Sequence, residues 1–428
     1  MASLSPARSA SQGVQHVKFA LVCVLTGLGA GIGGMLLALL LHLIQHLAYG
    51  YGLTADSRSM SFLSGVESAS ALRRVFALAV CGIVAGAGWF LVYRYGKPLV
   101  SVKKAVGTSD AVPPTPMPGI ATTAHALLQI ITVALGSPLG REVAPREIGS
   151  LWSGWLARIA GLDAAQSRLI VACGAGAGLA AVYNVPLGGA VFVLEVLLGT
   201  FAVRAVIPAI MTSVLAAVVA RIGLGNETQY AVPAFAVDTN LVIWSVIAGP
   251  IFGACAHYFI VWTTKARQHA PKNWQLLPLC LANFVIIGAL AITYPQILGN
   301  GKGPAALSFD GHITLVLAVT LLAIKLIITV STLRAGAEGG LMTPGIATGA
   351  LIAIILGVLW SMAFPGVALG AFALVGGAGF LASSMKMPIS ALVLVSEFTG
   401  VHQDFLVPML FAIVGSVLVS RYLESRSA

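Results

Sequence analysis

The chain has 428 residues, of which 58% are hydrophobic and only 9% are charged, and its mean hydropathy is +0.95. This composition excludes an ordinary soluble domain, in which about 25% of the residues are charged. The net charge of +10 comes from basic residues that cluster at the ends of apolar runs. Such clusters are typical of the cytoplasmic loops of a membrane protein, so they do not indicate a nucleic-acid partner.

The chain begins with a polar segment, residues 1–17, which we expect to be a tail ahead of one transmembrane domain, residues 18–428, with no soluble domain on either side. Apolar runs long enough to cross or enter a bilayer recur along the rest of the chain. In chain order these candidate helices are 18–48, 72–95, 120–139, 146–160, 166–183, 187–199, 201–222, 241–264, 276–296, 312–332, 342–363, 367–383, 388–398 and 404–423. The shortest of them predict helices that end inside the membrane, where irregular backbone is tolerated only if it is buried in protein or lines a cavity.

A diverged repeat relates the two parts of the chain. Ala177–Glu195 (AGLAAVYNVPLGGAVFVLE) recurs as Gly379–Glu397 (GFLASSMKMPISALVLVSE), and in both copies a proline precedes the final glutamate by nine residues. Repeated halves with interrupted helices are typical of transporters that bind their substrate where the halves meet. We therefore expect an all-α polytopic membrane protein with two inverted pseudo-symmetric halves, roughly 18–222 and 240–428, and with many tilted and partly spanning helices.

A glycine-rich break lies upstream of each copy, GSPLGREVAP at 136–145 and GAEGGLMTP at 336–344. In the first break, Glu142 stands just before a helical stretch whose first turn contains Pro145. The N-terminus of a helix offers unpaired N–H groups and a partial positive charge, which together attract anions. We expect the Glu142 carboxylate to occupy such a site or to leave it to an external anion. The alternative is that Glu142 and Glu147 are ordinary first-turn acids.

Three segments carry a family resemblance: GREVAPREIG, GAGAGLAAVYNVPLGGAVFVLE and GGLMTP. They resemble the three signatures of the CLC family of chloride channels and chloride/proton antiporters, and the resemblance covers the chain from about residue 18 to its end. It departs from the family pattern where Val-Ala replaces Gly-Pro after the first glutamate and where Leu-Met-Thr replaces Ile-Phe-Ala in the third signature.

The resemblance implies roles for individual residues. Glu142 resembles the gating glutamate, and Arg141 belongs to the same motif at the anion site. A helix N-terminus whose backbone amides hold the central chloride corresponds to Gly339, Gly340, Leu341 and Met342. Ungapped spacing back from Glu142 puts Ser101 at the position of the filter serine, although Val-Lys-Lys follows it in place of the usual Gly-Ile-Pro.

Two departures bear on proton coupling. Antiporters of the family carry a second glutamate that relays protons from the inside, and here that position is Val196, so the relay position is lost. The neighbouring Glu195 would point about 100° away from it on an α-helix. The inner-gate tyrosine of the family also has no match, because Tyr422 comes too early. Both departures favour chloride movement that is uncoupled, or only loosely coupled, to protons.

The resulting prediction is a homodimeric chloride channel, multi-pass in the bacterial inner membrane, with chloride or a similar anion and the lipid bilayer as partners and with no cofactor or metal. A chloride/proton antiporter that uses another internal acid is the nearest alternative, and a fluoride-selective member is a third. An intramembrane enzyme is a further alternative, but the sequence has no nucleophile or metal motif of a known type.

Lys325 interrupts the apolar run 313–330. A charge at that depth is costly and is a functional candidate by default. The alternative is a lysine that extends its ammonium to the membrane interface or to an aqueous vestibule.

Overall fold

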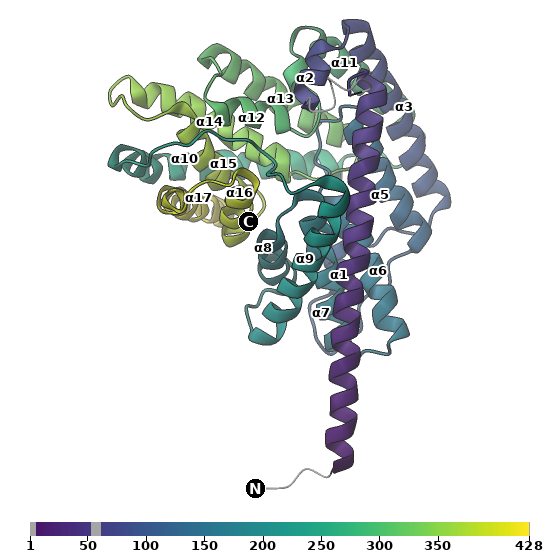
Figure 1. Cartoon of the computed structure of the whole chain (residues 1–428). Coiled ribbons are helices and arrows are strands. Elements are labelled where there is room, and N and C mark those ends of the chain that lie inside the picture. Colours follow the sequence, from purple (N-terminus) through teal and green to yellow (C-terminus); the bar gives the residue numbers. More distant parts are fainter. Residues whose placement is uncertain (1–5, 53–60, 428) are drawn as a thin grey trace. The chain divides into compact units, whose positions relative to one another are not determined.

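The computed structural model of the chain describes residues 6–52 and 61–427, and these form helices and connecting loops without a strand (Figure 1). The main helices are α1 (Pro6–Tyr49), α3 (Ala71–Tyr95), α5 (Gly119–Ala134), α6 (Val143–Ile159), α7 (Ala164–Tyr183), α8 (Pro186–Phe192), α9 (Val203–Leu224), α10 (Thr239–Gln268), α11 (Leu276–Thr293), α13 (Leu315–Ala335), α14 (Met342–Ser361), α15 (Leu369–Ser384), α16 (Pro388–Thr399) and α17 (Leu406–Ser427). The expected all-α class is confirmed.

The helix boundaries differ from the sequence prediction in two ways. Residues 1–5 of the predicted polar tail lie outside the described residues, and α1 already begins at Pro6, inside that tail. Three short helices were not predicted: α2 (Phe62–Ser68), α4 (Val102–Val106) and α12 (Lys302–Asp310). They have five to nine residues, which is too short for a helical pattern of apolar residues to stand out in the sequence.

In the described part of the chain, nine helical segments are long and apolar enough to cross a membrane. They are α1, α3, α7, α9, α10, α11, α13 and α14 together with the segment Gln403–Arg426, which contains most of α17. Four apolar segments of 10–17 residues accompany them: α5, α8 with the turn that follows it, α15 and α16. The chain is therefore a multi-pass membrane protein, and the expected mixture of spanning and partly spanning helices is confirmed.

The repeat seen in the sequence has the same backbone geometry in both copies. Asn184 directly follows α7, and Lys386 lies two residues beyond the end of α15; these two residues have positive φ angles of 55° and 54°. In each copy a proline two residues later begins the next short helix, α8 or α16. Because a positive φ is rare outside glycine, the shared conformation shows that the two interruptions are equivalent.

The second helix of each copy ends differently. α16 is α-helical to Thr399, whereas α8 passes after Phe192 into a π-helical turn, η2 (Val193–Leu198), which carries Glu195 and Val196. Counted from the proline that begins the helix, the first copy reaches its terminal left-handed glycine, Gly199, one residue later than the second copy reaches Gly400. The angle of 100° that we expected between Glu195 and Val196 assumed an α-helix, so that angle does not apply to this turn.

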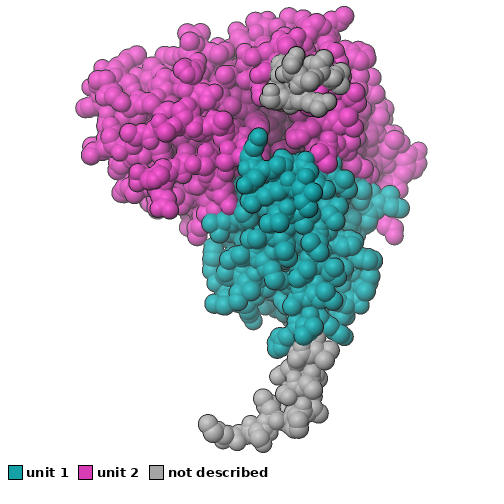
Figure 2. Space-filling model, viewed as in Figure 1, with its two compact units in different colours: residues 1–37, 98–123, 145–227 teal, residues 38–97, 124–144, 228–428 magenta. Residues whose placement is uncertain are grey.

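The chain forms two compact units, which are described separately (Figure 2). Unit 1 contains residues 1–37, 98–123 and 145–227, and unit 2 contains residues 38–97, 124–144 and 228–428. Unit 2 takes residues from both of the expected halves. Both glycine-rich breaks, apart from Pro145, therefore belong to unit 2.

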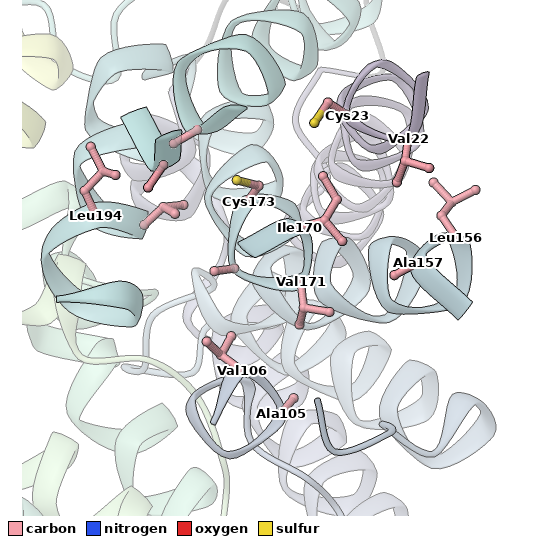
Figure 3. Close-up of a cluster of buried hydrophobic side chains, with 14 of the residues drawn as sticks. Val22, Cys23, Ala105, Val106, Leu156, Ala157, Ile170, Val171, Cys173 and Leu194 are labelled. Carbon is pink, nitrogen blue, oxygen red and sulfur yellow. The ribbon is translucent and has the colours of Figure 1, made fainter. Parts of the chain in front are cut away.

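Unit 1 is organised around a cluster of buried apolar side chains (Figure 3). Cys23 and Cys173 lie within this cluster and are 1% and 0% exposed, and both thiols are free. They fill space as small apolar groups. Close to this cluster, α6 and α7 cross without intervening side chains, since a Cβ atom on Gly149 would collide with the Gly174 carbonyl and the reverse is also true. Such backbone contact is what small residues permit in membrane helices.

Candidate functional site

The two glycine-rich breaks meet within unit 2. Gly140 N donates to Gly340 O at 2.7 Å, and Gly340 N donates to Gly140 O at 2.8 Å. This pair of hydrogen bonds is an isolated antiparallel bridge between segments that lie 200 residues apart in the sequence. It pairs two backbone N–H groups and two carbonyl groups that lie outside helices and so lack helical hydrogen bonds. It also fixes the first break against the start of α14.

The beginning of α14 lacks a capping group of its own. Several long helices here start with a side chain that accepts a hydrogen bond from the first turn, such as Asp163 for α7 and Asp238 for α10. At α14 the N-cap residue is Leu341, whose side chain is apolar and cannot accept one. The first amides of α14 therefore need an acceptor from elsewhere.

Glu142 supplies this acceptor. Its side chain is completely buried, and Oε1 accepts a hydrogen bond of 2.6 Å from the backbone N–H of Met342, the first residue of α14. A carboxylate at a helix N-terminus is stabilised both by the hydrogen bond and by the helix dipole. The sequence analysis expected such an anion position on the helix that follows Glu142, which is α6. The contact seen here is instead with α14, in the other half of the chain.

The two bridged glycines leave room for this carboxylate. A Cβ atom on Gly140 would overlap Glu142 Oε2, and a Cβ atom on Gly340 would overlap Oε1. Both positions thus have to lack a side chain if the carboxylate is to lie where it does. The glycines of the two motifs leave a position that holds the carboxylate of Glu142.

Arg141 lies directly beside this position in the sequence. It is 7% exposed, and its Nη2 donates to Gln229 Oε1 at 3.4 Å. Gly339, on the other segment of the bridge, is buried, and its carbonyl oxygen accepts a hydrogen bond of 2.6 Å from Arg267 Nη2. The structure therefore brings together Arg141, Glu142, Gly339, Gly340 and Met342 of the predicted set.

Two predicted site residues belong to unit 1, and their position relative to Glu142 stays a prediction. The Ser101 hydroxyl accepts a hydrogen bond of 3.3 Å from Lys104 N and so caps the short helix α4. Val196 lies half-buried in the π-helical turn η2. A π-helical turn inside an α-helix is frequently associated with function, which is a signal that the sequence did not reveal.

Lys325 is a buried ammonium group. It is 1% exposed, and its Nζ donates to Ile297 O at 2.9 Å and to Gly299 O at 2.5 Å. Gly299 N in turn donates to Gly136 O at 3.0 Å, at the start of the break that carries Glu142. The lysine is therefore not extended to a membrane interface, and it connects to the Glu142 segment through a single residue, Gly299.

The sequence analysis did not identify the contact between Arg267 and the GGLMTP segment. In the sequence, Arg267 is one of several basic residues near the end of an apolar run. The available signal was that Glu338 directly precedes the two glycines of that motif. In the described part of the chain, no group of three or more His, Cys, Asp or Glu side chains is arranged to hold a metal ion.

Comparisons with known proteins identify the family of the chain. The family model for the voltage gated chloride channel matches residues 75–421. The Citrobacter koseri protein named voltage-gated ClC-type chloride channel ClcB is 26% identical over 381 residues, which cover 86% of this chain and 88% of that protein. The Cronobacter sakazakii H(+)/Cl(-) exchange transporter ClcA is 30% identical over 308 residues, covering 69% of this chain and 65% of the relative.

The fold also matches a solved structure, that of a slow cyanobacterial Cl-/H+ antiporter, with a TM-score of 0.79 at 16% identity and 95% coverage of both chains. At this identity the likeness concerns the fold alone. The family model, in contrast, covers most of the chain and includes both segments that meet at Glu142. The chain therefore belongs to the CLC family of chloride channels and chloride/proton antiporters.

Proposed function

We propose that this protein is a chloride channel of the CLC type in which Glu142 is the gate. The observation that carries the proposal is the hydrogen bond between Glu142 Oε1 and Met342 N, which puts a carboxylate at a helix N-terminus flanked by two obligatory glycines. Chloride and a carboxylate carry the same charge and both accept hydrogen bonds from backbone N–H groups. The two therefore compete for the same amide, and the channel conducts when chloride takes the place of the carboxylate.

The chemistry of this position suits rapid release as well as binding. The partial charge at a helix N-terminus is about half an elementary charge, so it compensates for lost hydration without holding the ion as tightly as a full cation would. Conduction needs a site that is favourable enough to enter and weak enough to leave. Gly339, Gly340, Leu341 and Met342 provide such a site, and Ser101 is proposed as a further ligand from unit 1.

We propose that chloride flow is uncoupled, or only loosely coupled, to protons. A proton that crosses the inner half of the membrane needs a titratable group or a chain of water molecules, and Val196 offers no titratable atom. The expected result is a reversal potential in a reconstituted bilayer that follows the chloride gradient alone. A potential that shifts with a proton gradient in a fixed integer ratio would contradict this and support the exchange activity named for the Cronobacter relative.

We further propose a homodimer in the bacterial inner membrane, with one pore in each subunit. Large apolar side chains remain exposed along α17, among them Leu410, Phe411, Val414 and Leu418. In a membrane protein such a face contacts either lipid or another subunit. The expected result is twice the subunit mass in mild detergent by light scattering. Full chloride flux from a protein that is monomeric in the same lipid would contradict the dimer.

A further inference from the structure

A cluster of polar and charged side chains, formed by Arg267, Glu338 and Tyr93, contacts the bridge between Gly140 and Gly340 through Gly339. Arg267, near the end of α10, forms an ion pair of 3.2 Å between Nη1 and Glu338 Oε2. The other carboxylate oxygen, Glu338 Oε1, accepts a hydrogen bond of 3.2 Å from the Tyr93 hydroxyl of α3. All of these residues belong to unit 2.

The same guanidinium binds the anion-site backbone. Arg267 Nη2 donates to Gly339 O at 2.6 Å, and the N–H of that same peptide, on Gly340, donates to Gly140 O. The peptide between Gly339 and Gly340 is therefore held at both ends, by Arg267 and by the segment that carries Glu142. Two residues further on lies the Met342 amide, which binds the Glu142 carboxylate.

We propose that Arg267, held in place by Glu338 and Tyr93, is a positioning residue of the anion site and sets how tightly that site binds chloride. The inference rests on the proposed function of Glu142 and Met342. Arg267 acts in two ways. Its guanidinium fixes the orientation of the Gly339–Gly340 peptide, and its positive charge lies beside that peptide, two residues before the Met342 amide.

The surroundings distinguish this arrangement from a simple surface ion pair. The side chains of Arg267 and Glu338 are 40% and 31% exposed, so the ion pair by itself contributes little. The hydrogen bond to Gly339 O is charge-assisted and ends on a buried backbone carbonyl, and bonds of this kind are the stronger ones. Lys272 also lies at this cluster, with its Nζ 5.9 Å from the centre of the Tyr93 ring.

The cluster also has a defined side of the membrane. Tyr93 is followed by Arg94 and Lys97, and Arg267 stands in a segment with Lys265 and Lys272. Basic residues at helix ends accumulate on the cytoplasmic side. We therefore place this cluster on the cytoplasmic side of the membrane.

The test is chloride binding to purified full-length protein by isothermal titration calorimetry, with Glu142→Gln as the background so that no carboxylate competes. We expect Arg267→Gln to weaken chloride binding about tenfold, since a charge-assisted hydrogen bond near the site is lost. Arg267→Lys keeps the charge and should recover part of this loss. The matched control is Lys265→Gln, which removes the same charge two residues away and should change binding less than twofold.

Glu338→Gln separates electrostatic positioning from a purely structural role. The amide is nearly isosteric with the carboxylate. Its oxygen still accepts from Arg267 and its NH2 group can donate to the Tyr93 hydroxyl oxygen, but the counter-charge of Arg267 is gone. Chloride binding should therefore become severalfold tighter, opposite in sign to the effect of Arg267→Gln. A merely structural ion pair would weaken binding in both variants, and that outcome would overturn the proposal.

The remaining outcomes are also decisive. If Arg267→Gln binds chloride as tightly as Lys265→Gln does, Arg267 is not a positioning residue, although the proposed anion site stands. If the Glu142→Gln protein binds no chloride at all, the proposed anion site itself is wrong and this inference fails with it. Thermal unfolding of each variant shows whether it is folded, and Arg267→Lys and Glu338→Gln, which preserve side-chain size, keep the test valid if Arg267→Gln does not fold.

Discussion

Replacing Glu142 by glutamine is expected to raise chloride flux at neutral pH about tenfold and to abolish its dependence on pH. In the native chain the carboxylate occupies the Met342 amide, and chloride gains access when the carboxylate is protonated or displaced. Flux should therefore rise as the pH falls. A glutamine side chain carries no charge and forms a weaker hydrogen bond with the amide, so the anion displaces it at any pH. The measurement is chloride efflux from liposomes at a series of pH values.

The matched control is Glu147→Gln, a second buried acid five residues further along the chain. If the two glutamates were simply first-turn acids, both substitutions would change flux alike. The gate assignment instead expects the native pH profile in Glu147→Gln. An unchanged profile in Glu142→Gln, with normal expression, would remove Glu142 from the gate.

Gly340→Ala tests the same position without changing any charge. The new methyl group would overlap Glu142 Oε1, and the flexible glutamate side chain is the part that can move away. The variant should therefore show a weaker pH dependence while Glu142 is intact. In combination with Glu142→Ala there is no carboxylate to displace, so the double variant should behave like Glu142→Ala alone.

Replacing Lys325 by methionine is expected to weaken chloride binding about tenfold without lowering the stability of the protein. Among the described residues, no carboxylate forms an ion pair with this buried ammonium, whose only hydrogen bonds are to Ile297 O and Gly299 O. A unit charge 4 Å away is worth about 4 kcal/mol at an effective dielectric constant of 20, and still more than 1 kcal/mol at three times that distance. That is close to a factor of ten in affinity.

The effect on stability has two opposing parts. Methionine leaves two carbonyl groups without their donor, at about 1–3 kcal/mol each, but it also removes a buried charge whose desolvation costs several kcal/mol. We expect these to offset each other, so that the unfolding temperature stays the same or rises. Lys325→Arg keeps the charge and should keep the affinity.

The pH dependence of this difference gives a second check. Deprotonation removes the lysine charge, so the native protein should approach the affinity of Lys325→Met as the pH rises. A native affinity equal to that of Lys325→Met at every pH would show that the charge does not act on the anion, and that Lys325 only holds Gly299 against Gly136.

The sequence alone was sufficient for the fold class and for one side of the site. Apolar runs are long and few charges interrupt them, so helices could be located without knowing their neighbours. The repeat was visible because a proline and a glutamate keep their spacing. In the structure each proline is the first residue of a helix and comes two residues after a left-handed residue, which lies between that helix and the one before it. Glu142 was found because it combines a charge with a glycine-rich break in an apolar chain.

Only the tertiary structure decided which helix receives the carboxylate. From local sequence the nearest candidate was α6, which begins right after Glu142, whereas the contact is with α14. A helix N-terminus attracts anions through its unpaired amides and its dipole. Every α-helix has both features, so the sequence does not tell which helix binds the carboxylate. Which amide meets which carboxylate therefore depends on packing between distant segments, here through the bridge between Gly140 and Gly340.

The supporting residues were hidden for the same reason. Lys325 and Arg267 both bind backbone carbonyls, and a carbonyl group is present in every residue, so no residue type in the sequence marks the partner. The charge of Lys325 in an apolar run marked it as unusual, but its contact with Gly299 required the folded chain. Arg267 did not even stand out, because an arginine at a helix end is common in membrane proteins. The sequence by itself therefore determined which groups carry charge in the membrane, and the tertiary structure decided which backbone groups those charges hold.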